Sequence, residues 1–175
     1  MYLSYKMVSF TTLLALSGAA LASSSCKAPE PDQKKGMEIP GNWTWQVTGW
    51  EAGCARQGCY YDFNVTMPSV PGKVGGVKAH CQGNENWFRK GNTYKGCQLL
   101  DGVNNRVSAK LSERTSDSGT DFPTEILVSF EFGKGPFLPN PSYNFTGSHK
   151  TIYNAAVEPL QNFTIVPTTV TAVPY

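Results

Sequence analysis

The stretch Trp43–Met67, WTWQVTGWEAGCARQGCYYDFNVTM, decides the fold of this chain. Its first part alternates polar residues with the apolar Trp43, Trp45 and Val47. Its second part alternates polar residues with Tyr61, Phe63, Val65 and Met67. An apolar residue at every second position is typical of a strand with one buried face. A short turn separates the two runs and has Cys54 at one end and Cys59 at the other, so the stretch predicts two neighbouring strands pinned by a disulfide bond.

Similar short runs follow along the chain, separated by loops rich in Gly and Pro. The clearest of them are residues 93–100, 106–114, 124–132 and 161–166. Residues 152–157 fit either a short strand or a helical turn. About eight short strands with frequent turns predict an all-β domain, either an antiparallel β-sandwich or a small β-barrel, stabilised by disulfide bonds. We expect this single domain to span residues 42–166, with an extended C-terminal tail at residues 167–175.

The first 22 residues have the pattern of a cleaved secretory signal. Lys6 is their only charge, an apolar run follows it, and Ala20-Leu21-Ala22 supplies small residues where a signal peptidase cleaves. The apolar run is too short for a comfortable membrane span. Residues 23–41 are rich in Ser, Pro and Lys, which indicates a flexible leader. We therefore expect a secreted, extracellular protein that is not anchored in a membrane.

The charge balance and the N-glycosylation patterns of the chain also agree with an extracellular protein. The chain has 15 Lys and Arg against 13 Asp and Glu, and this even mixture lacks the basic patch that a nucleic-acid partner requires. The Asn-x-Thr pattern for N-linked glycosylation begins at Asn42, Asn64, Asn144 and Asn162. Each of these residues falls on the polar face of an alternating run, so the glycans are expected on the outside of the sheets.

All five cysteines follow the signal, where an oxidising compartment favours disulfide bonds. The simplest pairing is local, between Cys54 and Cys59 and between Cys81 and Cys97. Cys26 is left over, and it either remains free or bridges to a second chain. The cysteine spacing does not fit a zinc site, because only two histidines are present to complete one. We expect neither a metal nor another cofactor.

Catalytic patterns are missing from the sequence. No serine or cysteine has the sequence context of a nucleophile, and the paired carboxylates of a glycosidase are not indicated by spacing along one strand. We expect no enzymatic activity and predict no catalytic residue.

Aromatic residues are the enriched residue class, at 12% of the chain. Trp43 and Trp45 share the phase of Val47 and are predicted to lie in the core. The candidate surface contacts are Trp50, which is out of phase, together with Tyr60, Trp87 and Phe88.

The order of several motifs resembles a family of small secreted fungal proteins, the Alternaria major-allergen-like β-barrel group. Trp45-Gln-Val47, Phe63-Asn-Val65 and the pair Cys81 and Cys97 carry the resemblance, which covers about Trp43 to Leu100. It implies a secreted, non-enzymatic protein that engages host proteins or small ligands, and a disulfide-linked homodimer through a lone cysteine such as Cys26. The chain departs from the pattern in having no cysteine pair after Cys97 and an additional pair at Cys54 and Cys59.

These observations lead to three functional hypotheses. The first is a secreted, effector-like protein that acts by binding an unknown partner outside the cell. The second is a carbohydrate-binding module or lectin that recognises cell-wall glycans through exposed aromatic rings. The third is a carrier that holds a small apolar ligand inside the barrel.

Overall fold

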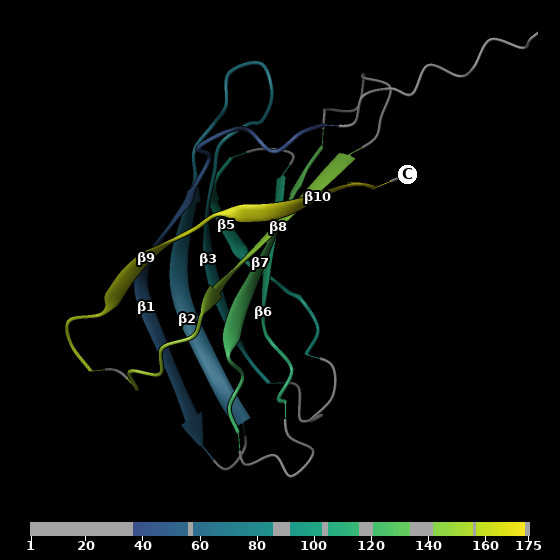
Figure 1. Cartoon of the computed structure of the whole chain (residues 1–175). Helices are drawn as coiled ribbons and strands as arrows, with labels where there is room; N and C mark the ends of the chain where they lie inside the picture. The colour runs from purple at the N-terminus through teal and green to yellow at the C-terminus, as the bar shows by residue number, and fades with distance from the viewer. Residues whose placement is uncertain are drawn as a thin grey trace, which may run out of the picture. The chain divides into compact units, whose positions relative to one another are not determined.

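Two antiparallel sheets of five strands each are packed together as a sandwich (Figure 1). The structure is a computed structural model that describes residues 37–55, 58–85, 92–102, 105–115, 121–133, 142–155 and 157–173. The first sheet has the strand order β5 (Gln98–Asp101), β3 (Val77–Asn84), β2 (Gly58–Met67), β1 (Trp45–Ala55) and β9 (Gln161–Ile165). The second sheet has the order β10 (Pro167–Val173), β8 (Ser142–Lys150), β7 (Glu125–Phe132), β6 (Asn105–Leu111) and β4 (Lys95–Gly96). The predicted all-β, disulfide-stabilised fold is confirmed.

The interior between the sheets is filled mainly by aromatic rings. The largest fully buried side chains include Trp45, Trp50, Phe63, Phe130 and Phe145. Trp43 is also buried, and its ring centroid lies 5.1 Å from that of Phe145 and 5.6 Å from that of Trp45. The Trp43 indole N–H donates a hydrogen bond to the Pro68 carbonyl at 2.8 Å. The predicted core position of Trp43 and Trp45 is therefore confirmed.

Trp50 is a correction to the expected surface contacts, because its side chain is 0% exposed. The cause is a bulge in β1, where the pairing with both neighbouring strands shifts register between Val47 and Glu51. Gly49 has a φ of 65° at this point, a left-handed conformation that glycine adopts without strain. The additional residue turns Trp50 inward, and its indole N–H donates to the Ile152 carbonyl at 2.8 Å.

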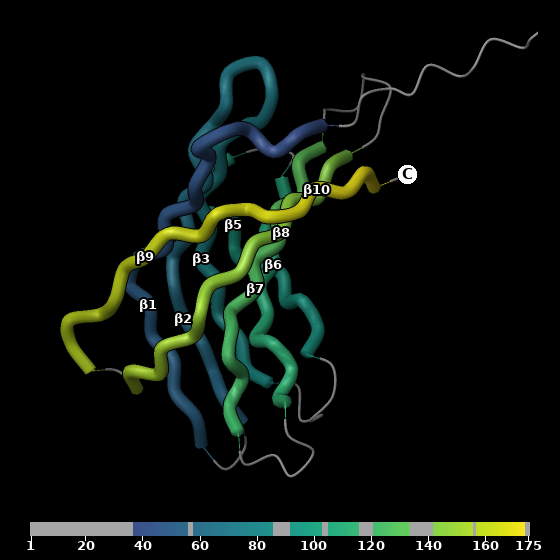
Figure 2. The backbone as a smooth tube through the Cα atoms, viewed as in Figure 1, coloured from purple at the N-terminus to yellow at the C-terminus, as the bar shows by residue number. Residues whose placement is uncertain are grey.

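Each lateral edge of the sandwich is crossed by a chain segment that passes from one sheet to the other, and Figure 2 shows the crossing from β9 to β10. On one side, Cys97 separates β4 of the second sheet from β5 of the first, so residues 93–100 are not one strand as predicted. The Cys81–Cys97 disulfide holds this crossing against β3. On the other side, Val166 separates β9 from β10. The residues expected as a C-terminal tail therefore include a strand of the second sheet, Pro167–Val173, paired with β8.

Residues 151–155 form neither of the two expected structures, strand or helical turn. They bind along β1 instead, where the Asn154 side chain accepts the Ala52 N–H at 2.9 Å and donates to the Trp50 carbonyl at 2.9 Å. Ala155 has a φ of 45° and ends the segment in a turn. Within the described ranges, no helix is long and apolar enough to cross a bilayer.

Gly147 gives a test of the crossing between β9 and β10. It pairs with Pro167, and an added Cβ would lie 2.9 Å from the Val166 carbonyl oxygen and 3.1 Å from the Pro167 Cα. Backbone atoms cannot rotate away, so we expect Gly147→Ala to lower the free energy of unfolding by about 1–3 kcal/mol in urea titrations. Gly96→Ala is the matched control, since nothing lies within 4 Å of its added Cβ. Equal losses in the two variants would contradict this account of the crossing.

Candidate functional site

The outer face of the first sheet carries aligned rows of side chains. β1 pairs with β2 and β2 with β3, so outward-facing residues of the three strands line up across the sheet. One row is Glu51, Asp62 and Gln82. The next row is Gly53, Tyr60 and Asn84. Residues directly opposite one another in antiparallel strands have Cβ atoms about 4.5–5.5 Å apart, so the members of each row can act on one ligand.

These two rows border an open pocket of about 310 Å³. Its lining residues are Glu51, Tyr60, Tyr61, Asp62, Gln82, Gly83, Asn84 and Lys95. Three neighbouring strands supply all of them except Lys95, which comes from β4 at the crossing between the sheets. The pocket therefore rests on rigid strands rather than on loops.

Tyr60 is the exposed aromatic residue of the pocket, with 37% of its surface accessible. Its ring lies against Gly53, where an added Cβ would come within 2.6 Å of a ring carbon. The phenol donates a hydrogen bond to Glu51 Oε1 at 2.9 Å. This hydrogen bond is the main cause that raises the pKa of Tyr60, followed by desolvation and by the charge of Glu51. The phenol consequently stays protonated as a donor at neutral pH.

A second hydrogen bond orients the other carboxylate. His80 Nε2 lies 2.8 Å from Asp62 Oδ1, and both side chains are partly exposed. In contrast, the side chains of Gln82, Asn84 and Lys95 have no hydrogen-bond partner among the described residues, although each lies in the pocket wall. Their amide and ammonium groups are donors, and the two amides are acceptors as well. The pocket thus offers unused hydrogen-bonding groups next to an aromatic ring.

The predicted disulfide bonds Cys54–Cys59 and Cys81–Cys97 are both present. Of the expected surface contacts, Tyr60 is at the pocket and Trp50 is in the core, while Trp87 and Phe88 lie outside the described residues. Cys26 also lies outside them, so its pairing stays a prediction.

The four sequon asparagines differ in their surroundings. Asn42, Asn64 and Asn162 are exposed, and Asn144 is half-buried. Asn162 Oδ1 accepts the Gly49 N–H at 3.0 Å, and Asn144 Oδ1 accepts the Ser129 hydroxyl at 2.7 Å. In both cases the amide oxygen is the bonded atom, which leaves the nitrogen available as the attachment atom of a glycan.

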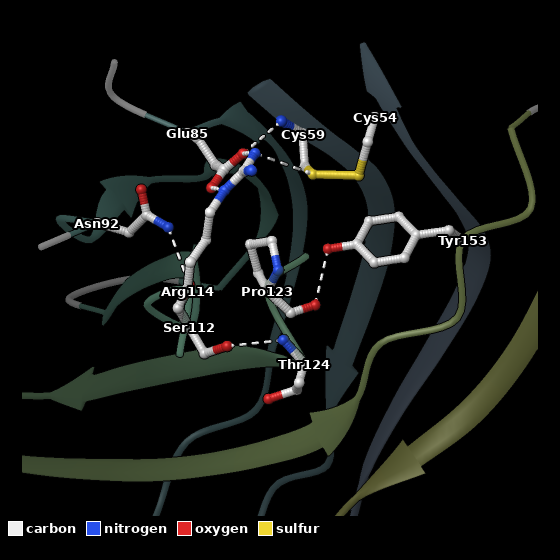
Figure 3. The surroundings of a disulfide bond; sticks show 9 residues. All are labelled: Cys54, Cys59, Glu85, Asn92, Ser112, Arg114, Pro123, Thr124 and Tyr153. Atoms are coloured by element: carbon white, nitrogen blue, oxygen red, sulfur yellow. Dashed lines mark hydrogen bonds and ion pairs between the residues drawn. A yellow bond between two sulfur atoms is a disulfide. The ribbon is translucent and has the colours of Figure 1, made fainter. Parts of the chain in front are cut away.

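A buried ion pair at the Cys54–Cys59 end of the sandwich was not foreseen from the sequence (Figure 3). Arg114 donates to both carboxylate oxygens of Glu85, at 2.8 and 2.6 Å. Glu85 Oε2 also accepts the Cys59 N–H at 2.6 Å. The hydrogen bond from Arg114 is the largest influence on Glu85 and holds the pKa of its carboxyl below the ordinary value. This cluster stabilises the turn end of the β1–β2 hairpin, next to the rows that border the pocket.

A smaller hollow of about 280 Å³ lies at the edge where β4 and β5 diverge. Leu99, Val107 and Glu131 are among its lining residues. Leu99 and Leu100 are exposed beside it, at 39% and 57%. The edge is therefore more apolar than the pocket on the first sheet.

The chain matches no protein-family model, no curated protein and no solved structure with which it was compared.

Proposed function

We propose that this protein is exported and acts outside the cell by binding, without catalysing a reaction, and that the polar pocket of the first sheet is its ligand site. The two intrachain disulfides are consistent with an extracellular protein, because such bonds persist in oxidising compartments. The aligned rows on β1, β2 and β3 give the pocket a fixed geometry. A preorganised surface of this kind reduces the entropy cost of binding.

The ligand class that best matches the pocket is a glycan. The observation that carries this assignment is the set of unpartnered side chains, Gln82, Asn84 and Lys95, around the exposed ring of Tyr60. Sugar rings present hydroxyl groups at their edges, which pair with such donors and acceptors, and C–H groups on their faces, which pack on aromatic rings. Glu51 and Asp62 add oriented acceptors.

The alternative of an apolar ligand carrier has less support. The space between the sheets is occupied by Trp45, Phe130 and Phe145, all 0% exposed. Ring centroids in this cluster lie 6.2–6.4 Å apart, which is ordinary aromatic contact. An apolar ligand would have to displace these rings.

A second candidate function, engagement of a host protein by an effector-like surface, is favoured by the exposed Leu99 and Leu100. Exposed leucines at a sheet edge beside a hollow can serve as apolar anchors for a protein partner. This surface lies at the β5 edge rather than at the polar pocket, so separate variants distinguish the two functions.

We predict that the double variant Gln82→Ala/Asn84→Ala loses glycan binding. Each lost hydrogen bond is expected to weaken affinity about two- to tenfold, since it contributes about 0.5–1.5 kcal/mol. Protein freed of its own N-glycans is applied to an array of cell-wall oligosaccharides, and hits are measured by calorimetry. Leu100→Asn is the control, exposed but outside the pocket, and should bind as the wild type does.

Three outcomes would contradict the proposal. Absence of any glycan signal would remove the ligand class. Loss of binding in Leu100→Asn alone would move the site to the β5 edge. Release of shortened oligosaccharides would contradict the absence of catalysis and would make Glu51 and Asp62, which face each other across β1 and β2, the candidate carboxylate pair.

A further inference from the structure

One sequon lies directly beside the pocket. Asn64 is on β2, and its pairing partners are Thr48 on β1 and His80 on β3. This row adjoins the row of Asp62. Asn64 is exposed, and its side chain has no hydrogen-bond partner among the residues that the structure describes. The amide nitrogen is therefore accessible and uncommitted.

The distance from Asn64 to the pocket matches a short oligosaccharide. Asp62 and Tyr60 precede Asn64 by two and four positions on the same strand face. At a rise of about 3.3 Å per residue, they lie roughly 7 and 13 Å along the strand. A sugar attached to Asn64 can therefore contact Asp62, and the following sugar can reach Tyr60.

The sequon at Asn162 lies on the same outer face and limits the space that is open to a glycan on Asn64. Asn162 lies on the opposite side of β1 from Asn64, and both approach Gly49. The Asn162 Oδ1 accepts the Gly49 N–H, which fixes its side chain over β1. A glycan on Asn162 would occupy the space over β1 and β9. Most of the pocket is lined by β2, which carries Asn64, and by β3, which lies farther from Asn162.

We propose that the N-glycan on Asn64 folds back over β2 and occupies the pocket with its two proximal N-acetylglucosamine residues, so that external glycans bind the glycosylated protein more weakly than the form without this glycan. This inference rests on the proposed glycan-binding function. The acetamide groups pair with the free amides of Gln82 and Asn84, and a sugar face packs on Tyr60. A tethered ligand has an effective concentration on the order of millimolar, so it outcompetes a chemically similar free glycan that is present at a lower concentration.

The test compares two sequon variants made in a glycosylating host. Thr66→Val removes the glycan at Asn64 while keeping Asn64 and a β-branched side chain at position 66. Thr164→Val removes the glycan at Asn162 in the same way and is the matched control. Mass spectrometry first verifies occupancy at each site. N,N′-diacetylchitobiose is then titrated into each protein by calorimetry.

We expect Thr66→Val to bind the disaccharide about tenfold more tightly than the wild type, the factor by which a tethered competitor at about 1 mM weakens a ligand with an intrinsic Kd of about 0.1 mM. Thr164→Val should bind as weakly as the wild type. Near-UV circular dichroism confirms that both variants keep the wild-type packing. Adding Asn84→Ala to Thr66→Val should abolish the gain.

The remaining outcomes separate the two proposals. Equal, measurable binding by the wild type and Thr66→Val would overturn occupation by the Asn64 glycan and leave the glycan pocket intact. An unglycosylated Asn64 in the secreted wild type would overturn it as well. No binding by any of the proteins would overturn both this inference and the assignment of the pocket to this class of glycan.

Discussion

Arg114→Met is expected to lower the free energy of unfolding at pH 7 by about 3 kcal/mol, the lower end of the range for breaking a buried ion pair. The Glu85 and Arg114 side chains are only 8% and 14% exposed. Removing the guanidinium leaves the Glu85 carboxylate desolvated, with the Cys59 N–H as its remaining donor among the residues that the structure describes. Urea unfolding followed by tryptophan fluorescence measures the change.

The pH dependence of the two proteins should have opposite sign. In the wild type, Arg114 lowers the pKa of Glu85. The resulting stability is present above the ordinary carboxyl pKa and is lost as the pH falls through the folded value. In Arg114→Met, burial is the largest remaining influence, ahead of the Cys59 hydrogen bond, so we expect the pKa of Glu85 to rise above its ordinary value. The Glu85 contribution to stability should then increase as the pH falls through that raised pKa, while in the wild type this group contributes no such gain.

Arg106→Met is the matched control for the ion pair. Arg106 lies 3.9 Å from Glu131, but its side chain is 85% exposed. Exposed pairs contribute little, so the expected change is below about 1 kcal/mol. If Arg114→Met costs no more than this control, or if its pH profile parallels that of the wild type, the buried pair does not stabilise the hairpin.

Phe130→Ala is expected to cost about 3–5 kcal/mol of unfolding free energy, because it removes a large side chain from a packed core. Phe130 is 0% exposed, and its ring centroid lies 6.0 Å from Trp43 and 6.2 Å from Phe145. The cavity would lie where the two sheets meet. The same urea titration measures the loss, and an unchanged slope would show that the variant still unfolds from a compact state.

Phe122→Ala controls for the loss of an aromatic ring as such. Phe122 is 53% exposed, although its ring centroid lies 5.7 Å from that of Tyr153. We expect a loss below about 1 kcal/mol, as for most surface substitutions. Similar losses in the two variants would mean that the aromatic cluster around Phe130 does not hold the sheets together.

Half of the pocket could be predicted from the sequence. The expected Cys54–Cys59 disulfide fixes the register of the hairpin, and counting outward from it places Glu51 opposite Asp62. The alternation of β2 also predicts that Tyr60 faces outward. The contribution of β3 could not be predicted, because a long connection separates it from β2 and leaves its register open.

Other features depended on local irregularity or on distant contacts. The prediction that Trp50 lies on the surface was wrong, because it assumed that the alternation of β1 continues without interruption through Gly49. A glycine inside a strand pattern is a signal for a bulge, and Gly49 was that signal here. The pairing of Glu85 with Arg114 brings together two charges 29 positions apart, and no periodicity marks either residue. The strand Pro167–Val173 was missed because its pairing with β8 is also non-local.

The most direct test of the binding pocket is nuclear magnetic resonance mapping with labelled Thr66→Val protein, which lacks the glycan at Asn64. On addition of N,N′-diacetylchitobiose, we predict that the shifted amides belong to the pocket rows, at Gly53, Tyr60, Asp62, Gln82 and Asn84. Amides near Leu99 and Glu131, at the other hollow, should not move. Shifts confined to that second hollow, or no shifts at saturating disaccharide, would contradict the account.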